Sequence, residues 1–175
     1  MEINGLVDRE KLLKISGRSR KPQMELAEKW GIKEYPSPAG GCKLTEPNYS
    51  LRLRDAFNRN ENLTQKEIDL LRFGRHFISS NNVKIIVTRT AEEGTEIKKI
   101  LSKEDLVFLP SHFNGAMAII HGDAKDEDKE LACKLVSRYS KGRDEAEVDV
   151  KFGNFGTPFK NELRVKPATE EEVSK

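Results

Sequence analysis

The spacing of apolar and polar residues changes along the chain near Gly74. Upstream, apolar side chains recur every three or four positions, as at Met24, Ala27 and Trp30, and this period predicts helices with one buried side over about 9–15, 20–30 and 48–58. Downstream, short runs rich in Ile and Val alternate with turn residues, which is typical of strands. We therefore expect a small, mainly helical N-terminal segment followed by a domain built around a sheet.

A clear helix start lies between these two regions. Thr64-Gln65-Lys66-Glu67 is a capping box, in which the side chains of Thr64 and Glu67 each accept the backbone N–H of the other residue. It predicts a helix over 65–73 that ends at Gly74. The polar run 58–62 comes just before it, and we place the domain boundary there. The N-terminal segment is then 1–60 and the second domain is 61–175.

The second domain alternates strand and helix patterns. Asn81-Asn82, between the first two strand patterns, is typical of a tight hairpin turn. Hairpin-like neighbours with interspersed helices predict an α+β fold, with a mixed or antiparallel sheet and packed helices. The expected strands are 77–79, 84–88, 106–109, 116–120, 148–151 and 163–165, and the expected helices are 91–101 and 126–139.

Composition argues against several classes of protein. The 175 residues are 36% hydrophobic, enough for one large or two small cores. The N-terminus is charged from Glu2 onward, and no apolar run approaches the roughly 20 residues that span a bilayer, so we expect a cytoplasmic protein without a membrane partner. Two cysteines without a CxxC, and three histidines without metal-like spacing, predict neither a disulfide framework nor a metal site.

Basic residues gather in clusters although the formal net charge is only +2. Arg and Lys neutralise phosphates, and Tyr or His can stack on unpaired bases, so these clusters are interpreted as an RNA-binding surface. Two alternatives stay open: each cluster is an ordinary solvated face, and Tyr139 is part of the apolar stripe of the 126–139 helix. The candidate residues are Arg18, Arg20, Lys21, Arg72, Arg75, His76, Arg89, Arg138, Tyr139, Lys141 and Arg143.

Cys42 is the candidate nucleophile. It follows Gly40-Gly41, where the backbone can approach a ligand closely and can leave N–H groups that favour a thiolate. The alternative is a small buried apolar side chain. The pattern therefore marks Cys42 as a candidate catalytic residue without deciding between the two interpretations.

Two stretches resemble a known family of RNA-binding domains. Arg75-His76-Phe77-Ile78-Ser79 and the helix end Arg138-Tyr139-Ser140-Lys141 are similar to the NFACT-R family. That resemblance implies binding of tRNA, because such domains occur in ribosome quality-control proteins and are also fused to PP-loop ATPases of tRNA thiolation. The chain departs from the family at Thr88-Arg89-Thr90, where a Gly-Arg/Lys-Asn pattern is usual.

The first third of the chain resembles a second family. Gly17-Arg18-Ser19-Arg20-Lys21-Pro22 and Tyr35-Pro36-Ser37-Pro38-Ala39-Gly40-Gly41-Cys42 are similar to the C-terminal part of PP-loop ATPases of the MnmA type. In that family a cysteine in a Gly-containing loop attacks or carries sulfur. The resemblance implies that Cys42 is the matching sulfur carrier and that a PP-loop ATPase subunit is a partner.

The motifs that hold ATP are absent from the sequence. It contains neither a Ser-Gly-Gly-x-Asp-Ser loop, which holds pyrophosphate in PP-loop enzymes, nor a Gly-x-x-x-x-Gly-Lys-Thr motif. We expect no cofactor in this chain, with ATP bound only on a partner subunit or a missing domain. Nor is a complete catalytic constellation visible, so the chain is not expected to be a complete enzyme alone.

Three functional hypotheses follow. In the leading one, the chain is the tRNA-binding component of a thiouridine-forming sulfur-transfer system and acts with a separate PP-loop ATPase. In the second, it is a tRNA- or ribosome-binding module of ribosome-associated quality control. In the third, it is an enzyme that acts alone. RNA rather than DNA is the expected nucleic acid in the first two.

Overall fold

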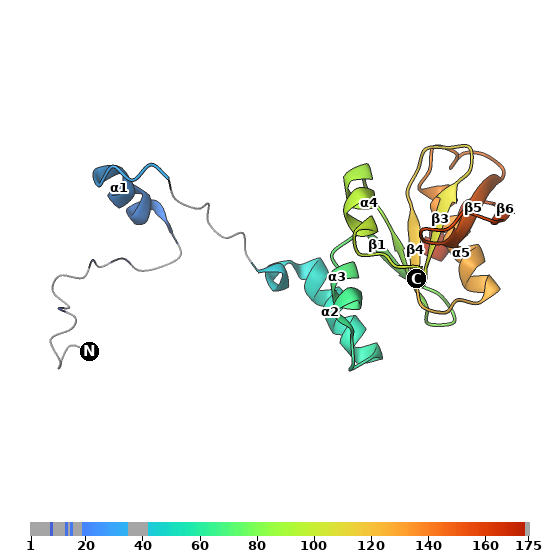
Figure 1. The fold of residues 1–175 in the computed structure, drawn as a ribbon, viewed down its shortest axis with the longest axis horizontal. Coiled ribbons are helices and arrows are strands. Elements are labelled where there is room, and N and C mark those ends of the chain that lie inside the picture. Colours follow the sequence, from blue (N-terminus) through green and yellow to red (C-terminus); the bar gives the residue numbers. More distant parts are fainter. Residues whose placement is uncertain (1–7, 9–12, 14, 16–18, 35–41, 174–175) are drawn as a thin grey trace. The chain divides into compact units, whose positions relative to one another are not determined.

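The computed structural model describes Asp8, Leu13, Ile15 and the ranges 19–34 and 42–173 (Figure 1). The chain divides into two compact units, Met1–Cys42 and Lys43–Lys175. The helix expected over 9–15 and the Gly40-Gly41 pair lie mainly or entirely outside the described residues.

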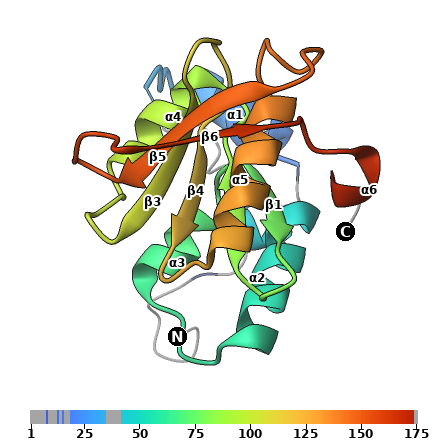
Figure 2. The same cartoon turned by 90° about the vertical axis from the view of Figure 1, so that its right-hand side faces the viewer.

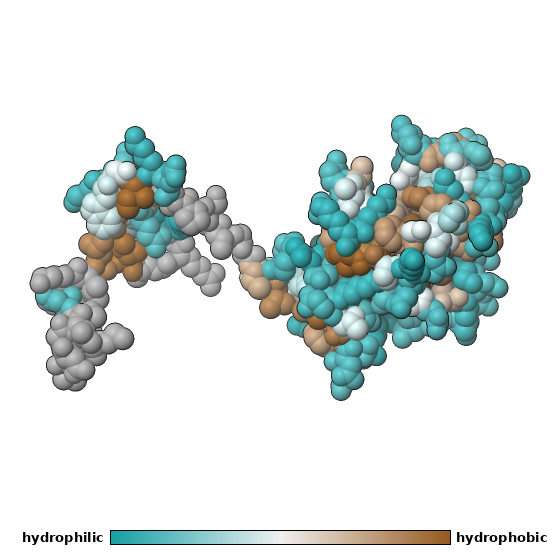
Figure 3. All heavy atoms as spheres, in the orientation of Figure 1, coloured by the Kyte–Doolittle hydropathy of each residue, from teal (hydrophilic) through white to brown (hydrophobic). Residues whose placement is uncertain are grey.

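The first unit contains one helix, α1 (Lys21–Lys29), with Pro22 in its first turn. The predicted buried side of this helix is wrong. Met24 is 52% exposed and Trp30 is 62% exposed, and α1 has no buried residue. Apolar surface is visible on this unit in Figure 3. Among the described residues of this unit there is no second helix or strand against which the apolar stripe could pack.

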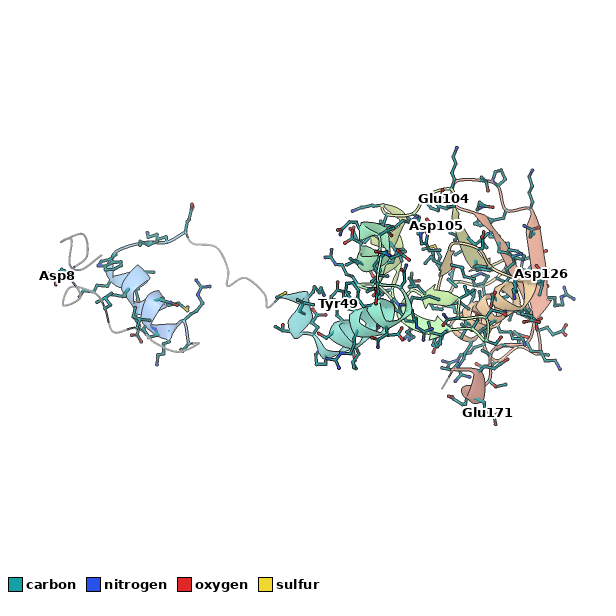
Figure 4. All side chains as sticks on the ribbon, turned by 90° about the horizontal axis from the view of Figure 1, so that it is seen from below. Asp8, Tyr49, Glu104, Asp105, Asp126 and Glu171 are labelled. Atoms are coloured by element: carbon teal, nitrogen blue, oxygen red, sulfur yellow. The ribbon has the colours of Figure 1, made fainter. Side chains whose placement is uncertain are left out.

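The second unit begins with three helical elements: η2 (Lys43–Thr45), α2 (Pro47–Arg59) and α3 (Gln65–Leu70). Thr64 and Glu67 form the predicted capping box at the start of α3. Tyr49 and Ala56 of α2 form a small buried cluster with Leu71, and Tyr49 is labelled in Figure 4. Helix α2 therefore packs within the second unit. The domain boundary between residues 60 and 61 stays a prediction.

A six-stranded antiparallel sheet forms the centre of the second unit, in the order β1-β2-β4-β3-β5-β6. The predicted α+β class is confirmed, and every expected strand is present. At the β1–β2 turn Asn82 takes a φ of 64°, a left-handed conformation that asparagine tolerates better than most residues. The strands are β1 (Arg75–Ile78), β2 (Lys84–Val87), β3 (Asp105–Pro110), β4 (Ala118–His121), β5 (Val148–Asn154) and β6 (Asn161–Val165).

Helices cover both faces of this sheet (Figure 2). Ile85 of β2 packs in one cluster with Leu135 of α5 (Asp126–Arg138), whereas its neighbour Ile86 packs in a second cluster with Ile97 of α4 (Ala91–Lys98). Successive strand residues point to opposite faces, so α5 and α4 lie on opposite sides. The described chain ends in α6 (Glu170–Val173). No helix in the described ranges combines the length and the apolar character needed to cross a membrane.

Candidate nucleic-acid interface

An open cleft of about 540 Å³ lies where β2 ends and β4 begins. One wall comes from α4 and another from the C-terminal end of α5. Three cationic side chains line it, those of Arg75, Arg89 and Lys98, together with Tyr139. Among the described residues that form the lining there is no Asp or Glu. The arrangement therefore concentrates positive charge in a concave surface, where an anion is attracted most strongly.

The start of β1 places Arg75 over an aromatic ring. Its guanidinium carbon lies 4.5 Å from the centroid of Tyr139, and the Phe77 ring lies 6.2 Å from the same ring. Gly74 precedes it at φ +64°, and a Cβ there would lie 2.5 Å from the Val87 carbonyl oxygen. Only glycine fits this approach, so Gly74 sets the position from which Arg75 enters the cleft.

Arg89 enters the cleft from the other side, on the turn between β2 and α4. Thr90 caps α4 by accepting the Glu93 N–H. The Glu93 carboxylate accepts the backbone N–H of Arg89 at 2.7 Å and that of Gly74 at 3.1 Å, and it lies 3.8 Å from the Arg89 guanidinium. Because Glu93 is mainly engaged by backbone groups, the Arg89 side chain, 42% exposed, keeps its charge at the rim.

One face of α4 forms the cleft wall. Ala91, Gly94, Thr95 and Lys98 follow the i, i+3, i+4, i+7 spacing of a single helix face. A Cβ at Gly94 would meet nothing within 4 Å, so the wall is shallow there. Sequence reasoning missed Lys98. The signal that could have found it is this run of small residues ending in a cation.

The end of α5 turns tightly to bring Tyr139 to the cleft. The buried Ser140 hydroxyl donates to the Ser137 carbonyl at 2.8 Å and accepts the Gly142 N–H at 3.0 Å. Ser140 also bridges Gly115 in the cleft lining, where a Cβ would lie 2.5 Å from Ser140 Cβ. Lys141 follows as an exposed residue next to this bridge. Tyr139 thus lines the cleft and Ser140 packs against Gly115, whereas Lys141 lies outside the cleft lining.

Three other predicted cations lie outside the cleft lining. Arg138 donates to the Ala168 carbonyl at 2.8 Å and pairs with Glu170, so it fastens the C-terminal segment. Arg72 is 51% exposed with Asp69 at 3.9 Å. Arg143 is 70% exposed beside Asp144.

His76 points to the other face of β1 from Arg75. Its Nε2 lies 2.8 Å from the Phe73 carbonyl oxygen, and its buried Nδ1 has no hydrogen-bond partner among the described residues. Burial, followed by the positive charge of Arg52, lowers the pKa of His76 to about 3. His76 is therefore neutral near pH 7 and adds no charge to the surface.

The remaining predicted residues belong to the first unit. Arg20 precedes α1 and Lys21 is its first residue, while Arg18 lies outside the described residues. Cys42 is exposed and Cys133 is buried. A role for Cys42 stays a prediction. Within the described part of the chain, no cluster of His, Cys, Asp or Glu side chains could hold a metal ion.

Comparisons with known proteins place the second unit in a family. Its closing 74–175 stretch matches the family described as the NFACT protein RNA binding domain. A solved structure, the C-terminal part of the fibronectin/fibrinogen-binding protein from Streptococcus suis, is similar with a TM-score of 0.51 and 21% identity, over 65% of this chain and 61% of that one. At this identity the likeness establishes a shared fold. No curated protein is significantly similar in sequence.

The match confirms the predicted NFACT-R resemblance and leaves the PP-loop resemblance of the first third as a prediction. The cleft lies within the matched residues, since its lining runs from Arg75 to Tyr139. The match also covers more than half of the 175 residues. A concave cationic surface and a family-level match thus coincide, and the chain belongs to the family of NFACT protein RNA-binding domains.

Proposed function

We propose that the cleft formed by Arg75, Arg89, Lys98 and Tyr139 holds the backbone of a tRNA, and that the chain presents this tRNA for thiouridine-forming sulfur transfer. The observation that carries the first part is a concave lining in which the described residues include three cations and no carboxylate. Cations in this setting release counterions from phosphates, which drives binding without reading sequence. Recognition then rests on the shape of the RNA.

The shallow wall of α4 favours a backbone over an isolated base as the ligand of this cleft. Small side chains at Ala91 and Gly94 leave space beside the helix, so a ribose-phosphate chain can lie against it. The Arg75 guanidinium already covers one face of the Tyr139 ring. The pair therefore presents a cationic group to the ligand, and this ring face is not free to stack on a base.

The sulfur-transfer part of the proposal rests on the first third of the chain. This region is similar to the C-terminal part of MnmA-type PP-loop ATPases, and Cys42 stands at the position of their sulfur-carrying cysteine. Cys42 is exposed, as a sulfur carrier must be. In this scheme a separate PP-loop ATPase binds ATP and activates the tRNA, while this chain supplies the tRNA-binding surface and the thiol.

A second candidate function is a tRNA- or ribosome-binding module in ribosome-associated quality control. The family match favours it, because it covers the RNA-binding domain and does not reach the Cys42 segment. The two functions share tRNA as ligand. They differ in whether Cys42 acts chemically and whether the ribosome is a partner.

Cross-linking of the full chain to cellular RNA, followed by sequencing, separates the candidates. Recovery of tRNA with little ribosomal RNA supports the sulfur-transfer proposal, whereas joint recovery with ribosomal RNA of the large subunit supports quality control. Recovery of neither RNA above an unrelated protein of similar charge would contradict both.

The role of Cys42 has its own test. In a system reconstituted with the PP-loop ATPase, Cys42→Ser should abolish thiolated tRNA and leave tRNA affinity unchanged, with Cys133→Ser as the matched control. Full thiolation by Cys42→Ser would exclude the sulfur-carrying role. Calorimetry should detect no ATP binding to the chain alone. Stoichiometric ATP binding would contradict the proposal that a separate PP-loop ATPase supplies the ATP site.

A further inference from the structure

A second pocket lies at the opposite end of the same two strands, where β2 begins and β4 ends. It has a volume of about 330 Å³ and is enclosed by α2, α3 and the β1–β2 turn. That volume falls at the lower end of the roughly 300–1,000 Å³ of small-ligand sites. Its floor is apolar, formed by Ala56, Leu63, Leu70, Leu71, Val83 and Ile86.

A histidine held by a buried carboxylate lines this pocket. His121 Nδ1 lies 2.7 Å from Asp105 Oδ1, and Asp105, labelled in Figure 4, is fully buried. Asp105 also accepts from the Lys66 ammonium at 2.6 Å and the Ser102 N–H at 2.6 Å. Burial alone would raise the pKa of Asp105, but these bonds outweigh it and lower the pKa. An ionised carboxylate only accepts, so Nδ1–H donates and Nε2 remains for a ligand.

Asn82 and Glu67 add donors and acceptors to the polar side of the lining, which also includes Asn60 and the carboxylate of Asp123. The Asn82 carbonyl oxygen accepts from Arg59, which leaves the Asn82 amino group as a donor at the pocket. Glu67 Oε2 accepts both the N–H and the hydroxyl of Thr64 at 2.7 Å, so Oε1 is left as an acceptor. Burial would raise the pKa of Glu67, but the Thr64 hydrogen bonds lower it overall, and the carboxylate is ionised at neutral pH.

Lys84 supplies the positive charge of this pocket. Its ammonium lies 3.8 Å from Asp55, longer than a direct hydrogen bond. Asp55 is also engaged by Arg59, whose Nε donates to it at 2.9 Å. Lys84 is therefore only loosely paired and can accept an anion at the pocket mouth, whereas Arg59 is fixed in the wall.

We propose that this pocket binds a nucleotide as a nucleoside monophosphate group. The base lies on the apolar floor, its polar edge meets Glu67, Asn82 and His121, and the phosphate lies near Lys84. Extruded bases are held in this way, between apolar side chains and hydrogen bonds to the base edge. A carboxylate accepts from an exocyclic amino group, which cytosine, adenine and guanine carry and uracil, whose base edge donates only through N3–H, lacks; Glu67 therefore favours the amino-bearing bases.

Two sources supply this chemistry: an unstacked nucleotide of a bound RNA, or a free nucleotide. The first source depends on RNA binding by the chain, and the second does not. The cleft and the pocket use separate residues, with no side chain common to both linings. Failure of one site is therefore distinguishable from failure of the other.

The test is an NMR titration of the full ¹⁵N-labelled chain with AMP, CMP, GMP, UMP and ribose 5-phosphate, and separately with a tRNA. We expect AMP, CMP or GMP to shift the amides of Leu71, Asn82 and Lys84, with UMP binding several-fold more weakly. His121→Asn keeps an amide N–H for Asp105 and removes Nε2, so it should weaken this binding about tenfold. His112→Asn, at a histidine whose side chain is 72% exposed outside the pocket, is the matched control.

Each outcome bears on the proposal. Shifts with free monophosphates support a free nucleotide as source, and shifts at the same amides with tRNA alone support an unstacked RNA nucleotide. If UMP bound as tightly as CMP, Glu67 would not select a base by its amino group, and the predicted recognition of the base would be overturned. No shift at these amides with any ligand, or equal binding by His121→Asn and the unmodified chain, would overturn the pocket assignment. Alanine at Arg75, Arg89 and Lys98 should weaken tRNA binding while free-nucleotide shifts persist.

Discussion

The two ends of the β2–β4 strand pair differ in how they use charge. At one end, Arg75, Arg89 and Lys98 face an open cleft whose lining, in the part of the chain that the structure describes, holds no carboxylate. At the other end, the lining of the pocket includes both a cation, Lys84, and a carboxylate, Glu67. Beside it, Lys66 and His121 both bind the buried carboxylate of Asp105. Surplus positive charge characterises the first end, and matched charge the second.

The two ends therefore suit different ligands: the first attracts an extended anion by its charge, and the second accepts a small ligand by its shape. Cations in excess of carboxylates at a concave surface produce a field that attracts a polyanion and weakens as salt rises. The buried, hydrogen-bonded carboxylate of Asp105 contributes little to the field outside, but it fixes Lys66 and His121 in place, and its removal is costly. One sheet therefore supports a surface suited to a long phosphate chain and a pocket suited to a small ligand.

The largest expected effect is on the buried network. Asp105→Ala leaves Lys66 and His121 without their shared partner, and we expect it to lower the free energy of unfolding by roughly 3–5 kcal/mol. Chemical denaturation monitored by circular dichroism measures the loss. The exposed neighbour Glu104 (Figure 4) is the control, and Glu104→Ala should change stability by less than about 0.5 kcal/mol. Equal small effects would mean that the network is not a structural support.

The next effect is on the cleft. Replacing Arg75, Arg89 and Lys98 together by Ala should reduce tRNA affinity about 100-fold at low salt and lower the slope of log affinity against log salt by about 2–3. A fluorescence titration at several salt concentrations measures both. The control removes the same charge from surface ion pairs, at Lys43, Lys129 and Arg164. Equal losses in the two triple variants would show that net charge, rather than the cleft, drives binding.

His76 tests whether the face of β1 opposite Arg75 belongs to the RNA surface. Its pKa is about 3 in the folded chain and about 6.5 when unfolded. Stability is therefore complete above pH 6.5 and decreases as the pH falls towards 3, because the unfolded chain binds the proton first. The free energy of unfolding decreases by about 2 kcal/mol between pH 7 and pH 5 for this reason. In His76→Gln that pH dependence should disappear while tRNA affinity stays within about twofold. A large loss of tRNA affinity in this variant would show that His76 contacts the RNA.

Arg138 gives the smallest effect and separates packing from binding. Loss of its hydrogen bond to the Ala168 carbonyl should cost Arg138→Ala about 1–2 kcal/mol of stability, without a change in the salt slope of tRNA binding. Arg143→Ala, at an exposed ion pair, should leave stability nearly unchanged. If Arg138→Ala instead lowered the salt slope by about one with unchanged stability, the side chain would belong to the RNA contact.

Much of the fold follows from local sequence signals. The capping box at Thr64, the hairpin at Asn82 and the apolar stripe of 126–139 each predicted an element that the structure contains. Such signals act within one or two turns of chain, so the sequence carries them directly. The same local character explains the wrong prediction of a buried side for α1. Periodicity shows which side of a helix is apolar, but not whether another element covers that side.

The cleft was only partly predictable. Arg75, Arg89 and Tyr139 were expected as RNA contacts and line one cavity, whereas Arg138 and His76, adjacent to them in sequence, are turned into packing contacts. Lys98 was missed because the helix that carries it also has three glutamates, so no basic cluster is apparent there in the sequence. Adjacent strand residues point to opposite faces, so a cluster in sequence is divided in space.

Local sequence patterns predicted most helices, strands and turns of the second unit, its α+β class and the likeness to an RNA-binding family. Tertiary structure alone decided which cations share a surface and which are used in packing. It also brought His121, Asp105 and Lys66 together, although Lys66 and Asp105 are 39 positions apart in the chain. Local preferences depend on neighbouring residues, whereas a site depends on how strand order and helix packing superpose distant ones.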